Sequence, residues 1–103
     1  MQSFRPFPPL VWRVYIVRCA DSSLYTGVSV DLSKRVHQHN NTKKAAKYTR
    51  SRRPVVLVWS SEFLERSSAL KLEYYIKKLS KKKKESLVAG NFNIDYDDVL
   101  PSP

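Results

Sequence analysis

Five polar side chains of this sequence have the chemical types that phosphodiester cleavage uses. They are two phenols ten residues apart, a guanidinium and an imidazole four residues apart, and one carboxylate farther along: Tyr15, Tyr25, Arg35, His39 and Glu73. Taken singly, each has an ordinary explanation, because strand tyrosines usually pack and a histidine near a helix end usually caps it. Together they supply proton-transfer groups, a cation for a phosphate and a metal ligand. The set therefore predicts a candidate catalytic site.

Glu73 occupies the most informative position of this set. It follows Ala69 by four residues and precedes Ile76 by three, so it lies beside the apolar stripe of a predicted helix and is partly buried. A buried carboxylate without a partner is costly, and such groups usually pair with a cation or bind a metal ion. Two interpretations stay open: a salt bridge to a nearby arginine, or an oxygen ligand for Mg²⁺.

The elements that must position these side chains begin with strands. Residues 10–19, LVWRVYIVRC, are β-branched and aromatic, and residues 24–28 resume the pattern after a polar turn. We expect the two runs to form an antiparallel hairpin, which places Tyr15 and Tyr25 on neighbouring strands. The apolar run at 55–60 predicts a third strand of the same sheet.

Helical spacing predicts the remaining elements. Either Ser29 or Asp31 can cap a helix over residues 32–40, in which Arg35 and His39 share a stripe next to the apolar face.

A second helix is expected over residues 69–79, capped by Ser67 or Ser68, and a third from Ser80 to Gly90. These elements predict one domain over residues 10–90. We expect residues 1–9 to form an N-terminal arm, and the acidic, proline-ended residues 91–103 to form a flexible tail.

The charge of the chain indicates the partner. The formal net charge is +10, from 19 Lys and Arg against 9 Asp and Glu, which favours a polyanion, with nucleic acid ahead of an anionic membrane surface. Much of this charge falls in residues 40–53, a predicted loop with one helical turn near Ala45-Ala46. For the lysines of residues 77–84, a solvated helix face is an equal alternative. The side chains predicted to bind backbone phosphates are Lys34, Lys43, Lys44, Lys47, Arg50, Arg52, Arg53 and Lys77.

The remaining composition bounds the setting. No stretch approaches the roughly 18 apolar residues that a membrane span needs, and the start of the chain lacks the apolar run of a secretory signal. Cys19 is the only cysteine, so neither an internal disulfide nor a cysteine-based zinc site can form, which fits a reducing compartment. We therefore expect a cytoplasmic protein associated with the nucleoid.

These residues also match a known pattern. Across residues 12–88, the chain resembles the GIY-YIG nuclease superfamily, including small stand-alone bacterial members and the nuclease domain of Slx-type structure-specific endonucleases. The matching positions are Arg13-Val14-Tyr15, Tyr25-Thr26-Gly27, Arg35, His39-Asn40 and Glu73. In the namesake motif, glycine stands at the place of Arg13 and isoleucine at that of Thr26, and both replacements fall in predicted strands.

The resemblance implies an α/β fold of the α+β type, with a central three-stranded sheet that contains antiparallel strands and is flanked by helices. It also implies hydrolysis of DNA phosphodiesters with one divalent ion, Mg²⁺ or Mn²⁺, and a role in repair or recombination. Carried over, Glu73 holds the metal, Tyr15 is the general base for the attacking water, helped by His39, Tyr25 lines the site and Arg35 stabilises phosphate charge.

Two alternatives remain open at this stage. The chain could be a non-catalytic nucleic-acid-binding module, in which the tyrosines only pack, and phosphate contacts alone do not distinguish DNA from RNA. A scaffold protein is a candidate partner because Slx-type enzymes have one, although this chain lacks the cysteines of their zinc-binding domain. Docking on an acidic protein is the weakest interpretation.

Overall fold

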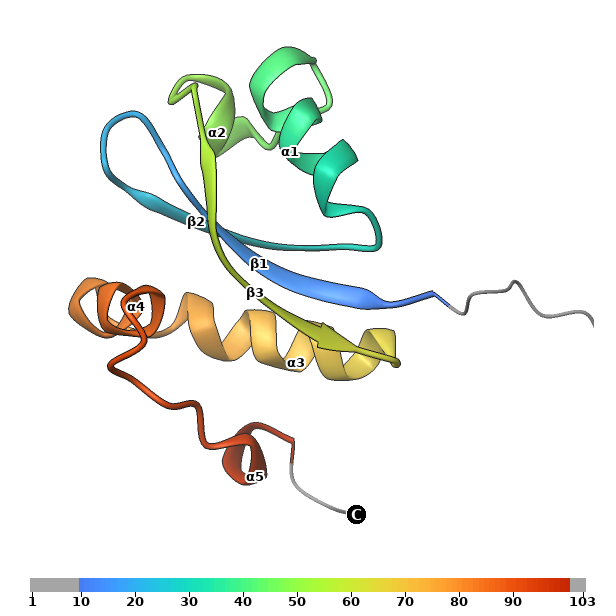
Figure 1. Ribbon diagram of the computed structural model, residues 1–103, viewed down its shortest axis with the longest axis vertical. Helices are drawn as coiled ribbons and strands as arrows, with labels where there is room; N and C mark the ends of the chain where they lie inside the picture. Colours follow the sequence, from blue (N-terminus) through green and yellow to red (C-terminus); the bar gives the residue numbers. More distant parts are fainter. Residues whose placement is uncertain (1–9, 101–103) are drawn as a thin grey trace, which may run out of the picture.

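A three-stranded antiparallel sheet organises the chain in the computed structural model, which describes residues 10–100 (Figure 1). Its strands are β1 (Trp12–Arg18), β2 (Leu24–Ser29) and β3 (Val56–Phe63), in the order β2-β1-β3. β1 is central, with its middle four residues fully buried, as the β-branched and aromatic run predicts. The predicted hairpin and third strand are confirmed. The arm expected at 1–9 lies outside the described residues.

The helices cover both faces of this sheet (Figure 1). On one face, α3 (Arg66–Lys77) buries its apolar stripe against alternate residues of β1; the fully buried members are Val14, Ile16, Ala69, Leu72 and Ile76. On the other face lie α1 (Leu32–Asn41) and α2 (Lys47–Arg50), over the side chains that point the opposite way: Tyr15 and Val17 of β1 and Cys19 directly after it. The period of two along β1 thus divides the core into two layers.

Helix boundaries follow local capping chemistry in two cases and depart from prediction in two. Asp31 caps α1 by accepting from the Lys34 N–H. Ser80 likewise caps α4 (Lys81–Val88) through the Lys83 N–H. The expectation that α3 begins at residue 69 behind a serine cap is wrong, because Ser67 and Ser68 lie inside its first turn, where backbone N–H groups need no helical partner.

The helical turn expected near Ala45-Ala46 lies slightly later, as α2. Ala45 is buried instead, so it anchors the loop before the helix begins.

The chain beyond α4 also differs from the expected flexible tail. Gly90, with φ of 81°, ends the helix in the left-handed conformation that glycine tolerates. After it, Phe92, Ile94 and Val99 pack against the α3 side of the core, and Asp95 caps a short helix, α5 (Tyr96–Val99). These spaced apolar residues attach the segment to the core, although its acidic composition predicts a loose tail. Within residues 10–100, the helices are too short and too polar to cross a membrane.

Candidate active site

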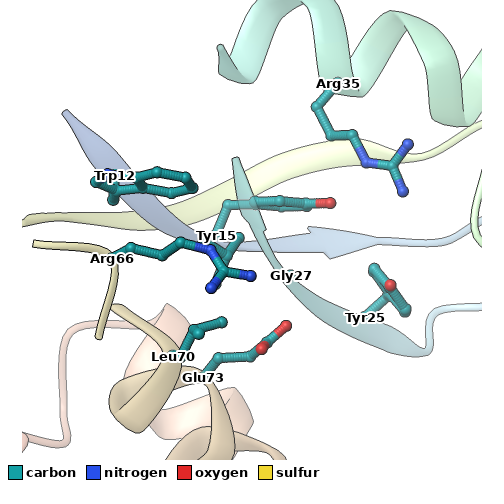
Figure 2. A pocket seen from close by; sticks show the side chains of 9 residues that line it. Trp12, Tyr15, Tyr25, Gly27, Arg35, Arg66, Leu70 and Glu73 are labelled. Atoms are coloured by element: carbon teal, nitrogen blue, oxygen red, sulfur yellow. The ribbon is translucent and has the colours of Figure 1, made fainter. Parts of the chain in front are cut away.

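A polar cavity of about 250 Å³ lies where the β2 edge of the sheet passes between α1 and α3 (Figure 2). Strands β1 and β2 supply its floor, Arg35 enters from α1, and α3 supplies Glu73 from the opposite side. The complete lining is Trp12, Tyr15, Tyr25, Gly27, Val28, Arg35, Arg66, Leu70 and Glu73. Four of the five predicted catalytic residues therefore line one cavity, although they are up to 58 residues apart in the sequence.

The fifth, His39, lies behind the cavity in a buried hydrogen-bonded chain. Its Nε2 is 2.7 Å from the Tyr15 hydroxyl, and its Nδ1 is 2.7 Å from the Thr49 hydroxyl. Thr49 donates its single hydroxyl hydrogen to the Ala46 carbonyl at 3.1 Å, so its oxygen accepts from His39 Nδ1–H. This assigns the imidazole proton to Nδ1 and leaves Nε2 as the acceptor for the Tyr15 O–H.

Burial determines the charge states of Tyr15 and His39 in this hydrogen-bonded series. Tyr15 is 1% exposed, and burial raises the pKa of its phenol to about 12, although the nearby Arg35 guanidinium acts in the opposite direction. His39 is fully buried, and burial, with the charges of Arg35 and Arg53, lowers its pKa to about 4. Both groups are neutral at pH 7. Because Tyr15 rests as a neutral phenol, it can take a proton from water only if its own proton leaves at the same time.

Gly27 makes room for the Tyr15 phenol. The two residues are paired across β1 and β2, and a Cβ on Gly27 would lie 2.5 Å from the Tyr15 oxygen and 2.7 Å from Cζ. Both separations are far inside van der Waals contact. Glycine is required here for close approach rather than for an unusual backbone angle. The last residue of the Tyr25-Thr26-Gly27 motif therefore positions the first tyrosine.

Tyr25 is held at the cavity by aromatic contacts on two sides. Its ring makes an edge contact with His39, with centroids 5.4 Å apart, and stacks with Tyr48 at 6.0 Å. The Arg52 guanidinium lies 3.8 Å from the Tyr48 ring centre and pairs with Asp21 at 3.0 Å. This column ties the β1–β2 turn to α2 and fixes the second phenol in place.

Arg35 is fixed from its own helix and from the following loop. One terminal nitrogen donates to the Gln38 side chain at 3.0 Å and to the Lys44 carbonyl at 2.8 Å. Its partners are thus neutral oxygens, and the positive charge is left for an anion in the cavity. Arg35 also borders a neighbouring hollow, whose lining includes one further cation, Lys34, and one carboxylate, Asp31.

Among residues 10–100, Glu73 is the only carboxylate that lines the cavity. Its side chain is 21% exposed and pairs with Lys77 at 3.3 Å, so the expected salt bridge exists with a lysine rather than an arginine. Within residues 10–100, no cluster of three or more His, Cys, Asp or Glu could hold a metal. A single half-buried carboxylate beside open polar space suits Mg²⁺, which keeps several waters and commonly binds through one or two carboxylates plus substrate phosphate.

The predicted phosphate-binding cations fall into two groups. Arg53 donates to the carbonyls of His39, at 2.6 Å, and Thr42, so like Arg52 it ties the loop to the fold. The others are exposed: Lys34, Lys43, Lys44, Lys47, Arg50 and Lys77. Of the exposed group, Lys77 pairs with Glu73, and the other five are available to a polyanion. Arg52 and Arg53 serve the structure.

Sequence reasoning missed several residues of the site. Thr49 and Gly27 act through contacts that only the fold creates. Arg66 and Leu70, however, precede Glu73 by seven and three residues, the spacing of one helix face. That periodicity could have placed both of them beside the carboxylate.

The fold and site define a small basic α+β domain with a mixed cationic, phenolic and carboxylate cavity, the composition of a phosphodiester-processing site. The sequence model of the family described as "GIY-YIG catalytic domain" matches residues 11–86 of this chain. The chain therefore belongs to the GIY-YIG family of nuclease domains.

Its relatives support this assignment. The chain is 52% identical over 80 residues to the UPF0213 protein DP2720 of Desulfotalea psychrophila, covering 78% of this chain and 73% of that protein. It is 47% identical over 93 residues to the UPF0213 protein VC_A0739 of Vibrio cholerae, covering 89% of this chain and 91% of that protein.

The NMR structure of the UPF0213 protein BH0048 from Bacillus halodurans resembles it with a TM-score of 0.52 and 37% identity, over 91% of this chain and all of that one. The NMR structure of the protein EF2693 from E. faecalis resembles it with a TM-score of 0.54 and 34% identity, over 78% of this chain and 84% of that one.

Proposed function

We propose that this protein is a metal-dependent endonuclease that hydrolyses DNA phosphodiester bonds. The observation that carries the proposal is the convergence of two phenols, a guanidinium and a carboxylate on one cavity, with an imidazole hydrogen-bonded behind the first phenol. Each group has a distinct task in phosphodiester hydrolysis, and membership of a nuclease family agrees with that division.

The proton path begins at a neutral tyrosine. As water attacks phosphorus, its proton passes to the Tyr15 oxygen while the Tyr15 hydrogen passes to His39 Nε2, 2.7 Å away. The two transfers occur together, so a free phenolate, which burial disfavours, is never required. The bond from phosphorus to the leaving oxygen then breaks. The imidazolium returns its proton to the Tyr15 oxygen while the Tyr15 hydrogen passes to the leaving oxygen, which completes the alcohol product and restores both neutral groups. In this scheme, Tyr15 relays the proton and His39 stores it.

The remaining groups bind and orient the phosphate. Arg35 neutralises a non-bridging oxygen of the phosphate. This interaction is stronger in the cavity than in open water, because the cavity admits less solvent. Tyr25, held by its stacked column, limits the positions that the phosphate can take. Glu73 would hold one Mg²⁺ or Mn²⁺, which when bound would polarise the phosphate and stabilise negative charge on the leaving oxygen. Lys77 must then release the carboxylate at least in part.

Exposed cations extend the site to a longer strand. Lys34 lines the hollow that shares Arg35 with the cavity, and Lys47 and Arg50 line another. Contacts of this type recognise the backbone rather than base edges, so we expect weak sequence preference and a steep loss of affinity with salt. Four further points remain predictions of this assignment. They are recognition of a particular DNA structure, a role in repair, a scaffold partner, and a location in the cytoplasm at the nucleoid.

The test is cleavage of labelled duplex, flap and four-way-junction DNA with Mg²⁺ or Mn²⁺, for the wild type, Glu73→Gln and Tyr15→Phe. We expect the wild type to cut at least one substrate and both variants to bind it with little cleavage. A matched RNA substrate reports the choice of backbone. An uncut panel for the wild type, at low salt and with either metal, would refute the proposal.

A non-catalytic binding module is the second candidate, and two observations favour it. Glu73 already has a cationic partner, and the raised pKa of Tyr15 leaves a resting phenol rather than a base. This candidate predicts equal DNA binding by the wild type and Glu73→Gln, with no cleavage by either.

A further inference from the structure

Arg66 stands at the cavity with a charge that the fold does not use. It lies in the first turn of α3, is exposed and lines the same cavity as Glu73 (Figure 2). Within residues 10–100, its side chain makes no hydrogen bond and has no carboxylate within 4 Å. Arg13, Arg18 and Arg52, in contrast, each pair with an acidic residue.

The position of Arg66 is unfavourable for its own helix. The first turn of a helix carries partial positive charge, so a cation there destabilises it. The first turn of α3 contains no acidic residue, and Glu65 at its N-cap makes no side-chain capping hydrogen bond. Within the described residues, the Arg66 guanidinium faces the indole of Trp12, whose ring centre lies 5.7 Å from the guanidinium carbon. This contact orients the guanidinium at the cavity wall and leaves its N–H donors available to a ligand.

The geometry points to a phosphate as that ligand, and to a different phosphate from the one that Arg35 contacts. Arg66 and Arg35 enter the cavity from opposite elements, α3 and α1, with Tyr15 between them (Figure 2). Arg66 precedes Glu73 by seven residues, so their backbones are about 10 Å apart along the helix axis at 1.5 Å per residue. Its long side chain spans only part of that separation, and the guanidinium stays more than 4 Å from Glu73.

We propose that Arg66, oriented by Trp12, binds the backbone phosphate next to the one that is cut. The inference rests on the proposed function for the identity of the ligand. Together, Arg35 and Arg66 would hold consecutive phosphates on either side of the attacking group, which fixes the direction of the strand across the cavity. A planar guanidinium suits this task because it can donate two parallel hydrogen bonds to one phosphate.

The test uses binding without cleavage. Fluorescence anisotropy of a labelled flap DNA, in EDTA and at several salt concentrations, compares the wild type, Arg66→Gln and Lys71→Gln. The last removes an equal charge from an exposed site on the same helix outside the cavity. We expect Arg66→Gln to weaken binding about five- to tenfold and to reduce the salt slope by about one phosphate contact.

A phosphate scan then locates the contact. Single neutral methylphosphonates replace successive phosphates of the DNA, one at a time. We expect one position at which the substitution weakens the wild type and Lys71→Gln but not Arg66→Gln. Equal affinity of Arg66→Gln and wild type, or loss of affinity by Arg66→Gln at every scanned position, would overturn the inference. Because no metal or cleavage is involved, either result is independent of whether the protein is catalytic.

Discussion

Gly27→Ala offers a direct test of the site, because it changes one atom against the reactive tyrosine. The new Cβ would lie 2.5, 2.7 and 2.9 Å from the oxygen, Cζ and Cε1 of Tyr15, where carbon contacts normally lie near 3.5–4.0 Å. Relief requires a shift of about 1 Å in the phenol, which is enough to break its 2.7 Å bond to His39. Overpacking typically costs about 1–3 kcal/mol, and an unsatisfied buried acceptor about 1–3 more.

The expected result is a loss of both stability and cleavage. At about 4 °C per kcal/mol, the value for a domain of about 100 residues, we expect the melting temperature to fall by roughly 8–25 °C. Cleavage measured well below the melting temperature should fall about 100-fold or more, because the proton relay is misplaced. Circular dichroism melting and the flap-DNA assay measure the two effects separately.

Gly90→Ala is the matched control. Gly90 has φ of 81°, and a Cβ there meets no atom within 4 Å, so alanine introduces only left-handed backbone strain of about 1–2 kcal/mol. We expect a lower melting temperature with unchanged cleavage at the assay temperature. If Gly27→Ala instead cleaves like the wild type, then the Tyr15 position is not needed for activity and the reasoning fails.

Three further outcomes follow from the same geometry. Thr49→Val, which keeps the side-chain shape, removes the acceptor of His39 Nδ1–H; we expect about 1–3 kcal/mol lower stability by denaturant titration and slower cleavage with unchanged KM, and an unchanged kcat would contradict the tautomer assignment. The pKa of His39 is about 4 in the fold and about 6.5 unfolded, so the unfolded chain takes up the proton first. Stability should therefore fall as pH drops from about 6.5 to about 4, by up to about 3 kcal/mol, and a slope equally steep in His39→Gln would contradict this cause. Lys77→Gln releases Glu73, so we expect half-maximal cleavage at a lower Mg²⁺ concentration, whereas an unchanged Mg²⁺ dependence would show that the ion pair does not compete with the metal.

The parts of the fold that short-range sequence patterns specify were predictable. Alternation along β1, the polar turn after it and the Asp31 cap act over a few residues, and they yield the hairpin and α1 as observed. Tyr15 and Tyr25 could be placed on neighbouring strands for the same reason. The start of α3 and the packing of residues 91–100 could not, because tertiary contacts decide them over local preference.

The functional contacts divide in the same way. A helix face carries Arg66, Leu70 and Glu73 to the cavity, and its spacing is visible in the sequence. In contrast, the roles of Gly27 and Thr49 depend on the register of β1 with β2 and on the packing of α2 against α1. The motif marks Gly27 without revealing its contact with Tyr15, and Thr49 has no local signature. Paired cations are equally hidden, since the sequence gives no sign that Arg52 meets Asp21, 31 residues away.

Burial differs between the two parts of the site, and this difference limits which of its residues can be substituted. The relay of Tyr15, His39 and Thr49 is part of the α1 side of the core, so any change in it alters packing as well as proton transfer. Arg35, Arg66 and Glu73 are partly or fully exposed at the cavity wall, where substitution leaves the core intact. Binding of the strand can therefore be tuned by replacing wall residues at little cost in stability, whereas the proton path is constrained by folding itself.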